Sequence, residues 1–462
     1  MFMRPIFFLL GIIFSSLLTA QTIPEKITAA YSKLTSDDQL KFGIVSLYVI
    51  DSKTGSVIFE KNKDLGLAAA STQKVITAST AYELLGHNYT YKTTLGYTGN
   101  LVKGTVSGNL VIGGSGDPTL GSWRYNDTKE DKIVSDFNEA IYKQLIGGVD
   151  GGVIVKHHYN TETIPDGWIW EDLGSYYGAG ASDLIWRENQ YDVLMKSSGT
   201  IGDTAKFVKT IPARIQGLQL KIEATAAAKG SGDRSYIFQP SYDENYHIRG
   251  TIPINEDHFT ISGSIPHPDQ QFAAAIASMF PKSFINKKRE VSVDNSAPVQ
   301  VFYTHISPPL DSIAFWFLKR SINLYGEALI KTIAHEKTGI GSTDTGVNII
   351  KSFWKTKGID PLSINMKDGS GLSPGNRITA NALVSILQYD IKQPWFDSFL
   401  NALPEINGLK MKSGSIGDVL SYTGFAKSAE GNKYTFAIIV NNYNGSYTTM
   451  RQKMWKLLDI LK

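Results

Sequence analysis

The sequence predicts an α+β protein: a five-stranded antiparallel sheet with helices beside it, and a β-rich region inserted between its strands. Two segments near the start, residues 43–50 and 56–62, are rich in β-branched and aromatic residues and flank a short turn, as in a β-hairpin. Three further strand-like segments stand near the end, at residues 408–416, 420–427 and 433–443. Between the two groups, the chain first contains short strand-like segments rich in glycine and then segments with helical periodicity. A sheet that joins both ends of the chain accounts for all five segments.

The other elements follow in chain order. Residues 71–85 are predicted to form a helix, because their apolar positions fall on one helical face. Residues 93–293 form an inserted β-rich region, in which we expect two subdomains, and residues 21–92 and 294–462 form the main domain. Helical periodicity returns from about Asp311. The last helix either lies on a membrane surface or packs on the sheet, and its place directly after the last strand favours packing.

The N-terminus has the pattern of a secretory signal peptide. Arg4 supplies a positive charge, residues 6–18 form an apolar run, and a small residue precedes Gln21. We therefore expect residues 1–20 to be removed on export. The alternative is an uncleaved membrane anchor, although the run is shorter than the roughly 20 residues of a bilayer-spanning helix. No later segment is apolar enough to span, so we expect no integral membrane span after cleavage.

Composition excludes several functions. The formal net charge of the 462 residues is +3 and no basic block concentrates it, so we expect no nucleic-acid partner. The chain has no cysteine, which excludes thiol catalysis, zinc–thiolate sites and disulfides. The histidines show no metal-ligand spacing, since His157 and His158 are adjacent and His335 has no second histidine four positions on. We expect no metal site.

A serine and a lysine open the predicted helix in the segment AASTQKVITAST, residues 69–80. Ser71 precedes Lys74 by about one helical turn, so the amine can reach the hydroxyl. Backbone N–H groups at a helix start also favour developing negative charge. The serine could instead be a simple helix N-cap. The same spacing recurs at Ser352 and Lys355, where we expect a solvated helix face, so the pair alone does not identify a site.

Two later segments complete a three-part pattern. Ser321 and Asn323 form S-x-N at a break between two helical stretches, and Lys412 begins K-S-G in a late strand. The motifs S-x-x-K, S-x-N and K-[T/S]-G, in this order, are typical of penicillin-interacting serine enzymes. Two literal K-T-G segments are set aside, because residues 53–55 form a hairpin turn and residues 337–339 end a helix at a glycine.

The chain resembles the class C low-molecular-mass penicillin-binding proteins, the D-alanyl-D-alanine carboxypeptidase/endopeptidase family, over nearly all of its mature length. Besides the three motifs, the segments GGSGDPTL, SINLYGEAL, DGSGLSPGNRIT and MKSGSIGDVLSYTGFA carry the likeness. The long interval between the first and second motifs also fits, because class C members carry inserted domains there. The resemblance implies a penicillin-binding/β-lactamase-like transpeptidase fold for the main domain. Ser413 stands where many relatives have threonine, which keeps the hydroxyl.

The resemblance also implies roles for the site residues. Ser71 would be the nucleophile, Lys74 its activator and Ser321 a proton relay to the leaving amine; whether the lysine is itself the base is disputed in such enzymes. The oxyanion would lie between the backbone N–H groups of Ser71 and Ser415. Asn323 would bind a substrate amide, and the K-S-G segment would bind the terminal carboxylate. The predicted catalytic residues are Ser71, Lys74 and Ser321, and the predicted substrate-binding residues are Asn323, Lys412, Ser413, Gly414 and Ser415.

The implied reaction is cleavage of D-Ala-D-Ala carboxypeptide bonds, peptide cross-links of peptidoglycan, or both, through an acyl-enzyme on Ser71. The family's chemistry requires no cofactor. The implied partners are peptidoglycan stem peptides and β-lactam antibiotics, and the implied location is the periplasm. The balance between carboxypeptidase and endopeptidase activity depends on the shape of the groove, which the sequence does not define.

Three other functions have less support in the sequence. A serine β-lactamase would need fast deacylation, and no general base for that step can be named from the sequence. A non-catalytic cell-wall-binding protein would be favoured by a missing catalytic group, and none is missing. Residues 371–375 match the G-x-S-x-G elbow of α/β-hydrolases, but Pro374 lacks the backbone N–H that such a site uses. We interpret this segment as a structural loop near the site.

Overall fold

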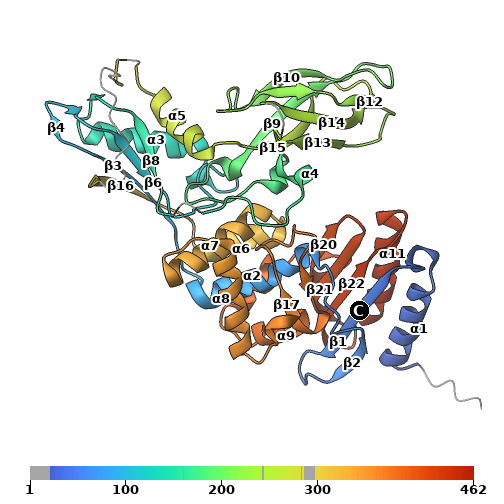
Figure 1. The fold of residues 1–462 in the computed structure, drawn as a ribbon. Helices are drawn as coiled ribbons and strands as arrows, with labels where there is room; N and C mark the ends of the chain where they lie inside the picture. Colours follow the sequence, from blue (N-terminus) through green and yellow to red (C-terminus); the bar gives the residue numbers. More distant parts are fainter. Residues whose placement is uncertain (1–20, 160, 242–243, 282, 286–296) are drawn as a thin grey trace, which may run out of the picture.

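The structure is a computed structural model that describes residues 21–159, 161–241, 244–281, 283–285 and 297–462. The predicted signal peptide, residues 1–20, lies outside the described residues. The described chain forms two regions (Figure 1): one contains a large sheet, most of the helices and both ends of the described chain, and the other is formed by the middle of the chain. Among the described residues, no helix combines the length and the apolar character needed to cross a bilayer.

A six-stranded antiparallel sheet, in the order β19-β20-β21-β22-β1-β2, forms the centre of the first region. Its strands are β1 (Ile44–Asp51), β2 (Val57–Lys61), β19 (Glu405–Ile406), β20 (Leu409–Ile416), β21 (Val419–Lys427) and β22 (Lys433–Asn441). The α+β class is confirmed, and β1 pairs with β22 along its whole length. The predicted count of five strands is wrong, because Asn407 and Gly408, with φ of 50° and 69°, turn the chain within two residues and pair β19 with β20.

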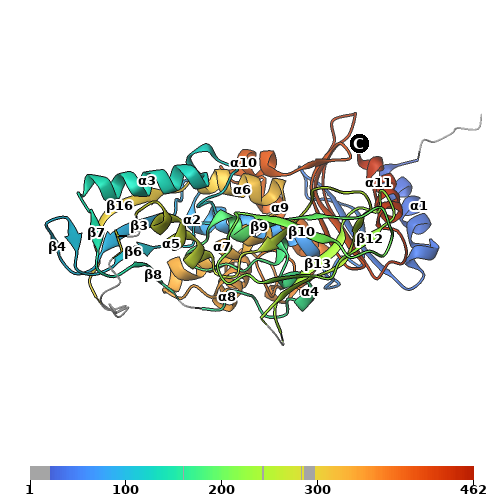
Figure 2. The same ribbon diagram turned by 90° about the horizontal axis from the view of Figure 1, so that it is seen from above.

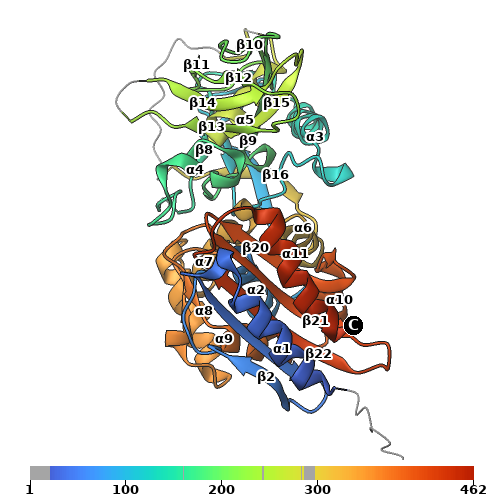
Figure 3. The ribbon, with the colours of Figure 1, turned by 90° about the vertical axis from the view of Figure 1, so that its right-hand side faces the viewer.

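Helices cover both faces of this sheet. On one face lie α1 (Ile23–Thr35) and α11 (Tyr447–Leu458), side by side in Figure 3. Helix α11 buries Met450 and Met454 in a core that it shares with α1 and the sheet, so the favoured packing of the last helix is confirmed. The helices of the other face are α2 (Lys74–Leu85), α6 (Leu310–Lys319), α7 (Asn323–Thr338), α8 (Thr343–Thr356), α9 (Ala380–Asp390) and α10 (Phe396–Ala402). A short pair, β17 (Ile364–Asn365) and β18 (Arg377–Ile378), lies beside them.

The middle of the chain forms two parts, each with its own cluster of buried apolar side chains. Figure 2 shows helix α3 (Glu130–Lys143) of the first part and strand β12 (Thr225–Ala227) of the second part toward opposite ends of this region. The first part contains the sheet β16-β3-β6-β8, a small sheet β4-β5-β7 and two helices: β3 (Lys92–Tyr97), β4 (Leu101–Val102), β5 (Thr105–Val106), β6 (Leu110–Gly113), α3 (Glu130–Lys143), β7 (Gly148–Val149), β8 (Val153–Lys156), α5 (Pro268–Ser278) and β16 (Gln300–Ile306). The second contains α4 (Trp170–Leu173), β9 (Gln190–Lys196), β10 (Lys206–Ile211), β11 (Leu220–Ile222), β12 (Thr225–Ala227), β13 (Arg234–Phe238), β14 (Tyr246–Pro253) and β15 (Phe259–Ser264).

Two clusters are what two subdomains would produce, although the division of the chain into domains stays a prediction. Strand β16 pairs with β3 although it follows residue 293, so it hydrogen-bonds with the inserted region. Helix α7 joins the two regions: the Tyr325 hydroxyl donates to Glu188 Oε1 at 2.8 Å, and Lys331 Nζ donates to the backbone oxygen of Glu162. These buried polar contacts hold the inserted region against the helix that begins at Asn323.

Candidate active site

Ser71 lies just before α2, in a short 3-10 helix formed by Ala70–Gln73. The predicted helix therefore starts one turn late, at Lys74. Ala70 is held at φ 46°, a left-handed conformation that is costly for a residue with a side chain. Gly371, itself at φ 85°, packs directly on this turn, because an added Cβ would lie 2.1 Å from the Ala70 carbonyl oxygen. The backbone before the serine is thus fixed by a distant loop.

Lys74 is fully buried beneath Ser71. Its Nζ lies 2.8 Å from Ser71 Oγ, 2.7 Å from Asn323 Oδ1 and 2.7 Å from the backbone oxygen of Ser370. The amide and peptide oxygens can only accept hydrogen bonds. A neutral amine that donates to both of them therefore directs its lone pair at the third neighbour, the Ser71 hydroxyl. Burial lowers the pKa of Lys74 to about 7, although the carboxyl groups of Asp368 and Glu327 act in the opposite direction.

The inserted region orients the side-chain amide of Asn323. Nδ2 of this residue lies 2.8 Å from the backbone oxygen of Tyr177 and donates to it, since a carbonyl oxygen can only accept. Oδ1 therefore faces Lys74. The amide has a second N–H bond that it can offer to a carbonyl group of a substrate.

Lys412 lies in the middle of β20, and it is buried. Its Nζ donates to Ser321 Oγ and to the backbone oxygen of Ser413, both at 2.8 Å. Burial, together with repulsion from Lys74, holds the pKa of Lys412 well below its ordinary value. Ser321 occupies the break between α6 and α7 at φ 57°. A hydroxyl held against an amine in this way is suited to relay a proton.

The K-S-G segment runs along β20 beside the serine. A Cβ on Gly414 would lie 2.5 Å from the Ala69 oxygen and 2.8 Å from Ser71 N, so only glycine lets the strand approach this closely. Ser413 is half-buried and Ser415 is exposed, and both lie beyond the short pairing of β20 with β19. Six of the predicted site residues are therefore brought together where α2, α7 and β20 converge, and Ser413 and Ser415 flank Gly414 on β20.

Sequence comparison identifies the family. Residues 27–460 match the D-Ala-D-Ala carboxypeptidase 3 (S13) family. The chain belongs to this family. It is 23% identical to a D-alanyl-D-alanine carboxypeptidase of Actinomadura sp. (strain R39), over 89% of this chain and 80% of that one. It is also 23% identical to the D-alanyl-D-alanine carboxypeptidase DacB of Haemophilus influenzae, over 84% of this chain and 83% of that one.

Comparison with solved structures supports the same conclusion for the fold of this S13 carboxypeptidase. Penicillin binding protein 4 (dacB) from Haemophilus influenzae matches it with a TM-score of 0.78 at 21% sequence identity, over 93% of this chain and 99% of that one. The predicted penicillin-binding fold and family are therefore confirmed. Among the described residues, no group of three or more His, Asp or Glu side chains is placed to hold a metal ion.

Sequence reasoning missed two buried carboxyl groups beneath the site of the S13 carboxypeptidase. Asp368 accepts hydrogen bonds from five N–H groups, which are Gln73 Nε2, Trp168 Nε1, Gly371 N, Ser373 N and Asn376 Nδ2. Glu327 follows Asn323 by one helical turn on α7 and accepts from Gly369 N at 3.0 Å. Both carboxyls lie in segments that carry the family likeness, so an acidic residue inside such a segment was the available signal.

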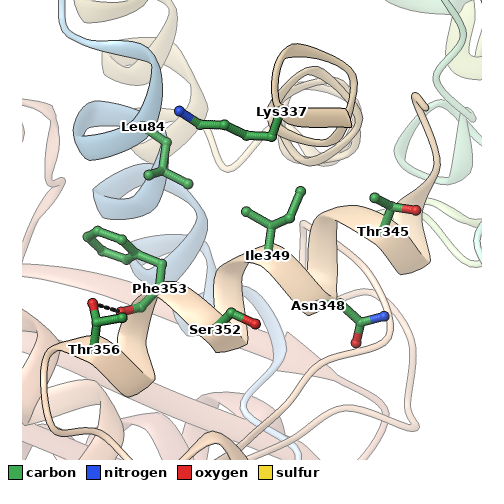
Figure 4. A pocket seen from close by; sticks show the side chains of 8 residues that line it. All are labelled: Leu84, Lys337, Thr345, Asn348, Ile349, Ser352, Phe353 and Thr356. Carbon is green, nitrogen blue, oxygen red and sulfur yellow. Dashed lines mark hydrogen bonds between the residues drawn. The ribbon is translucent and has the colours of Figure 1, made fainter. Parts of the chain in front are cut away.

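The competing sequence motifs have structural roles. Ser373 is fully buried, and its hydroxyl donates to the backbone oxygen of Gly167 at 3.1 Å, so the interpretation of residues 371–375 as a structural loop near the site is confirmed. Gly339 ends α7 at φ 76°, as expected of a C-cap. Ser352 is exposed and lines a shallow surface groove between α2 and α8 with Leu84 and Phe353 (Figure 4), away from the site described above.

Proposed function

We propose that this protein is a serine DD-peptidase that cleaves D-Ala-D-Ala bonds and peptide cross-links of peptidoglycan through an acyl-enzyme on Ser71, which β-lactams also acylate. The contacts of Lys74 carry the proposal, because they direct the lone pair of a neutral amine at the Ser71 hydroxyl. A pKa of about 7 makes the neutral amine available near neutral pH. Membership in the S13 family supports the substrate class.

In the proposed acylation, Ser71 Oγ attacks the carbonyl carbon of the penultimate D-alanine while its proton passes to Lys74 Nζ. The backbone N–H groups of Ser71 and Ser415 stabilise the oxyanion that forms. The C–N bond then breaks as the Ser321 hydroxyl protonates the leaving amine, and Lys412 Nζ, 2.8 Å away, returns a proton to Ser321. In deacylation, water attacks the ester carbonyl and one of its protons passes through the Ser321 hydroxyl to the neutral Lys412, while Lys74 returns its proton to Ser71 Oγ as the ester C–O bond breaks, so both lysines regain their starting states.

Substrate binding would use the other side of the site. Lys412 and the Ser413 hydroxyl would bind the terminal carboxylate, whose negative charge favours the protonated form of the buried lysine. The second N–H bond of Asn323 would bind an amide carbonyl of the substrate. Support for β-lactams as ligands comes from the Haemophilus influenzae penicillin binding protein 4, which has also been crystallised in complex with a novel β-lactam.

Export to the periplasm belongs to the same proposal. It is supported by the charged and apolar pattern of residues 1–20 and by a peptidoglycan substrate, which lies outside the cytoplasm. Sequencing the N-terminus of the native protein should return a start at or near Gln21. A native protein that begins at Met1 would contradict it.

Fluorescent penicillin tests the proposed function. Intact-mass measurement should find one stable adduct on the wild-type protein and none on S71A, and peptide mapping should place it on Ser71. A label on Ser352 or Ser373, or no label, would count against the proposal. Rapid release of hydrolysed penicillin would indicate a β-lactamase, and binding of wall fragments without turnover would indicate a non-catalytic wall-binding protein. Release of D-alanine from a stem peptide, compared with cleavage of a cross-linked dimer, separates the two peptidase activities.

A further inference from the structure

Glu327 is a buried carboxyl group to which the proposed mechanism gives no role. It is completely inaccessible to solvent on α7, one helical turn after Asn323. Its Oε2 accepts from Gly369 N at 3.0 Å, whereas Oε1 is buried and has no hydrogen-bond partner among the described residues. The Ser370 hydroxyl, on the residue after Gly369, is also buried and interacts with the Glu327 carboxyl, where it can accept a hydrogen bond from a protonated Oε1 as well as donate to an ionised one. An ionised carboxylate with an unpaired buried oxygen would be costly.

The neighbouring carboxyl group has the opposite environment. Asp368 is also completely buried, but it accepts from five N–H groups, and a proton on it would face only donors. These surroundings suit a carboxylate, whereas those of Glu327, with one backbone N–H and a hydroxyl that can also accept a hydrogen bond, suit a protonated acid. Two carboxyl groups in one buried site resist double ionisation, so one proton between them is the favourable state. The hydrogen bonds assign that proton to Glu327.

Glu327 also holds the backbone that faces Lys74. The Gly369 N–H is bound by Glu327, the Gly369 oxygen accepts from Thr77 Oγ1 at 2.7 Å, and the next carbonyl, that of Ser370, accepts from Lys74. The loop is pressed against α7 here, since a Cβ on Gly369 would lie 2.2 Å from the Gly326 oxygen. A change at Glu327 would therefore move one of the two carbonyls that direct the lysine's lone pair.

We propose that Glu327 is a positioning residue that stays protonated in the working enzyme, holding the Gly369–Ser370 backbone in place while leaving Asp368 as the single anion beneath Lys74. The proposal rests on the proposed function of Lys74 as the base for Ser71. With both carboxyls ionised, their attraction would keep Lys74 as an ammonium ion, which has no lone pair to accept the serine proton. A neutral Glu327 keeps the free amine accessible.

The electrostatics agree with this assignment. Burial raises the pKa of Glu327 to about 8 and repulsion from Asp368 acts in the same direction, whereas hydrogen bonds with Ser370 and Gly369 and attraction to Lys74 act in the opposite direction. Lys331, on the same helix, is the other charged group that interacts with Glu327. The groups that face Lys74 are Asp368, Glu327 and Lys412. Burial therefore favours the neutral form of both Lys74 and Glu327.

The first test measures the protonation state of the Glu327 carboxyl directly and does not depend on enzyme activity. The full-length protein is labelled with ¹³C at the glutamate side-chain carboxyls, and the Glu327 signal is assigned as the one missing from E327Q. We expect the shift of a protonated acid at neutral pH and a titration midpoint near 8. A carboxylate shift at neutral pH would overturn the proposal. This result stands even if S71A shows that Ser71 is not the acylated residue, so the two proposals can fail separately.

The second test uses two variants of similar size. E327Q keeps an oxygen for Gly369 N–H and a neutral side chain, so its acylation rate and the acid limb of its pH–rate profile should stay close to those of the wild type. E327M removes the acceptor, and acylation should fall about 10- to 100-fold, as expected for an unpaired buried donor. A shift of the E327Q acid limb to lower pH by about a unit would mean that Glu327 is ionised in the wild type. An E327M variant as fast as the wild type would remove the positioning role.

Glu188 provides the control for a merely structural effect. It is also a buried carboxyl that contacts α7, through Tyr325, but it is paired with Arg124 at 2.8 Å. E188Q should lower stability while leaving the acid limb where it is in the wild type. An acid limb that moved equally in E188Q and E327Q would show that any disturbance of α7 has this effect and would overturn the specific role of Glu327. If E327M does not fold, the carboxyl signal and E327Q still decide the proposal.

Discussion

The chain contains the spacing S-x-x-K twice in its helical region, and the two copies have opposite surroundings. Ser71 and Lys74 lie at the start of α2, where the lysine is fully buried and contacts three oxygens. Ser352 and Lys355 lie on the outer face of α8, where both are exposed to solvent. Side chains three positions apart on a helix are neighbours in both cases. The spacing brings the groups together but does not make the lysine a base.

What separates the two copies is supplied by distant parts of the chain. The oxygens that fix Lys74 come from α7 and from the loop after β17, and the inserted region orients one of them through Tyr177. Burial, which lowers the pKa of Lys74 to about 7, comes from the same elements. Reactivity in this fold is therefore a property of the tertiary environment, and each of its components can be removed separately.

The largest expected effect comes from removing the buried lysine. K74A should slow acylation about 100- to 10,000-fold, whatever the charge of the substrate, because Lys74 takes the proton of the attacking serine. K355A, the matched change at the second copy, should acylate at the wild-type rate. Stopped-flow acylation with a penicillin and an activated ester measures both. If K74A kept its acylation rate, the base would have to be sought at Ser321 and a water molecule.

Lys412 should matter more for some substrates than for others. K412A should slow acylation by any substrate with an amine leaving group, because Lys412 returns a proton to Ser321, but it should slow carboxylate-bearing substrates about 10- to 100-fold more than an ester or amide analogue, as expected for the loss of a charged hydrogen bond. Because two ammonium groups repel each other, K412A should also raise the pKa of Lys74 and move the acid limb to higher pH. An equal loss for both substrates would refute the role in binding the carboxylate.

The two copies also show what the sequence could predict. The order of the motifs, and the strand that contains Lys412, predict Ser71 rather than Ser352 as the nucleophile, and the strand pattern predicts the sheet formed by both ends of the chain. The sixth strand, β19, is also predictable from the sequence, because Asn407-Gly408 between two apolar segments is a strong hairpin signal.

Other parts could not be predicted, for a physical reason. Asp368 and Glu327 lie in different segments, and only the packing of α7 against the loop after β17 puts both beneath Lys74. Hydrogen bonds from Trp168 and to Tyr177 depend on how the inserted region docks, which no local pattern encodes. Periodicity and motif order report local structure, and these contacts are not local.

The pH dependence of acylation gives a smaller, graded effect. With the pKa of Lys74 near 7, the lysine is mostly neutral above that pH and becomes protonated below it. The acylation rate should therefore fall about tenfold per pH unit on the acid side of pH 7. K355A should show the same curve. A rate that did not change between pH values on either side of 7 would mean that a neutral Lys74 is not required.

The smallest expected effect comes from removing a hydrogen bond that links the Ser71 turn, Ala70–Gln73, to the inserted region through Asp368. The indole N–H of buried Trp168 donates to Asp368 Oδ2 at 2.9 Å, and Asp368 in turn binds Gln73, two residues after the serine, and Gly371, which packs on Ala70. W168F keeps an aromatic ring and removes this donor. Because four other donors remain on Asp368, we expect unfolding to become easier by about 1.5–3 kcal/mol, the range for a hydrogen bond to a charged group, while acylation falls less than about tenfold.

Trp170 provides the matched control for that change. It is two positions further along the chain and 44% exposed, and its indole N–H donates to the backbone oxygen of Gln239 at 3.0 Å. W170F should cost less than about 1 kcal/mol, because the lost bond is neutral and accessible to water, and it should leave acylation unchanged. Urea unfolding and penicillin acylation of both variants measure the difference. Equal destabilisation would mean that the contact with Asp368 is no stronger than an ordinary surface hydrogen bond, and that the Ser71 turn keeps its geometry without the inserted region.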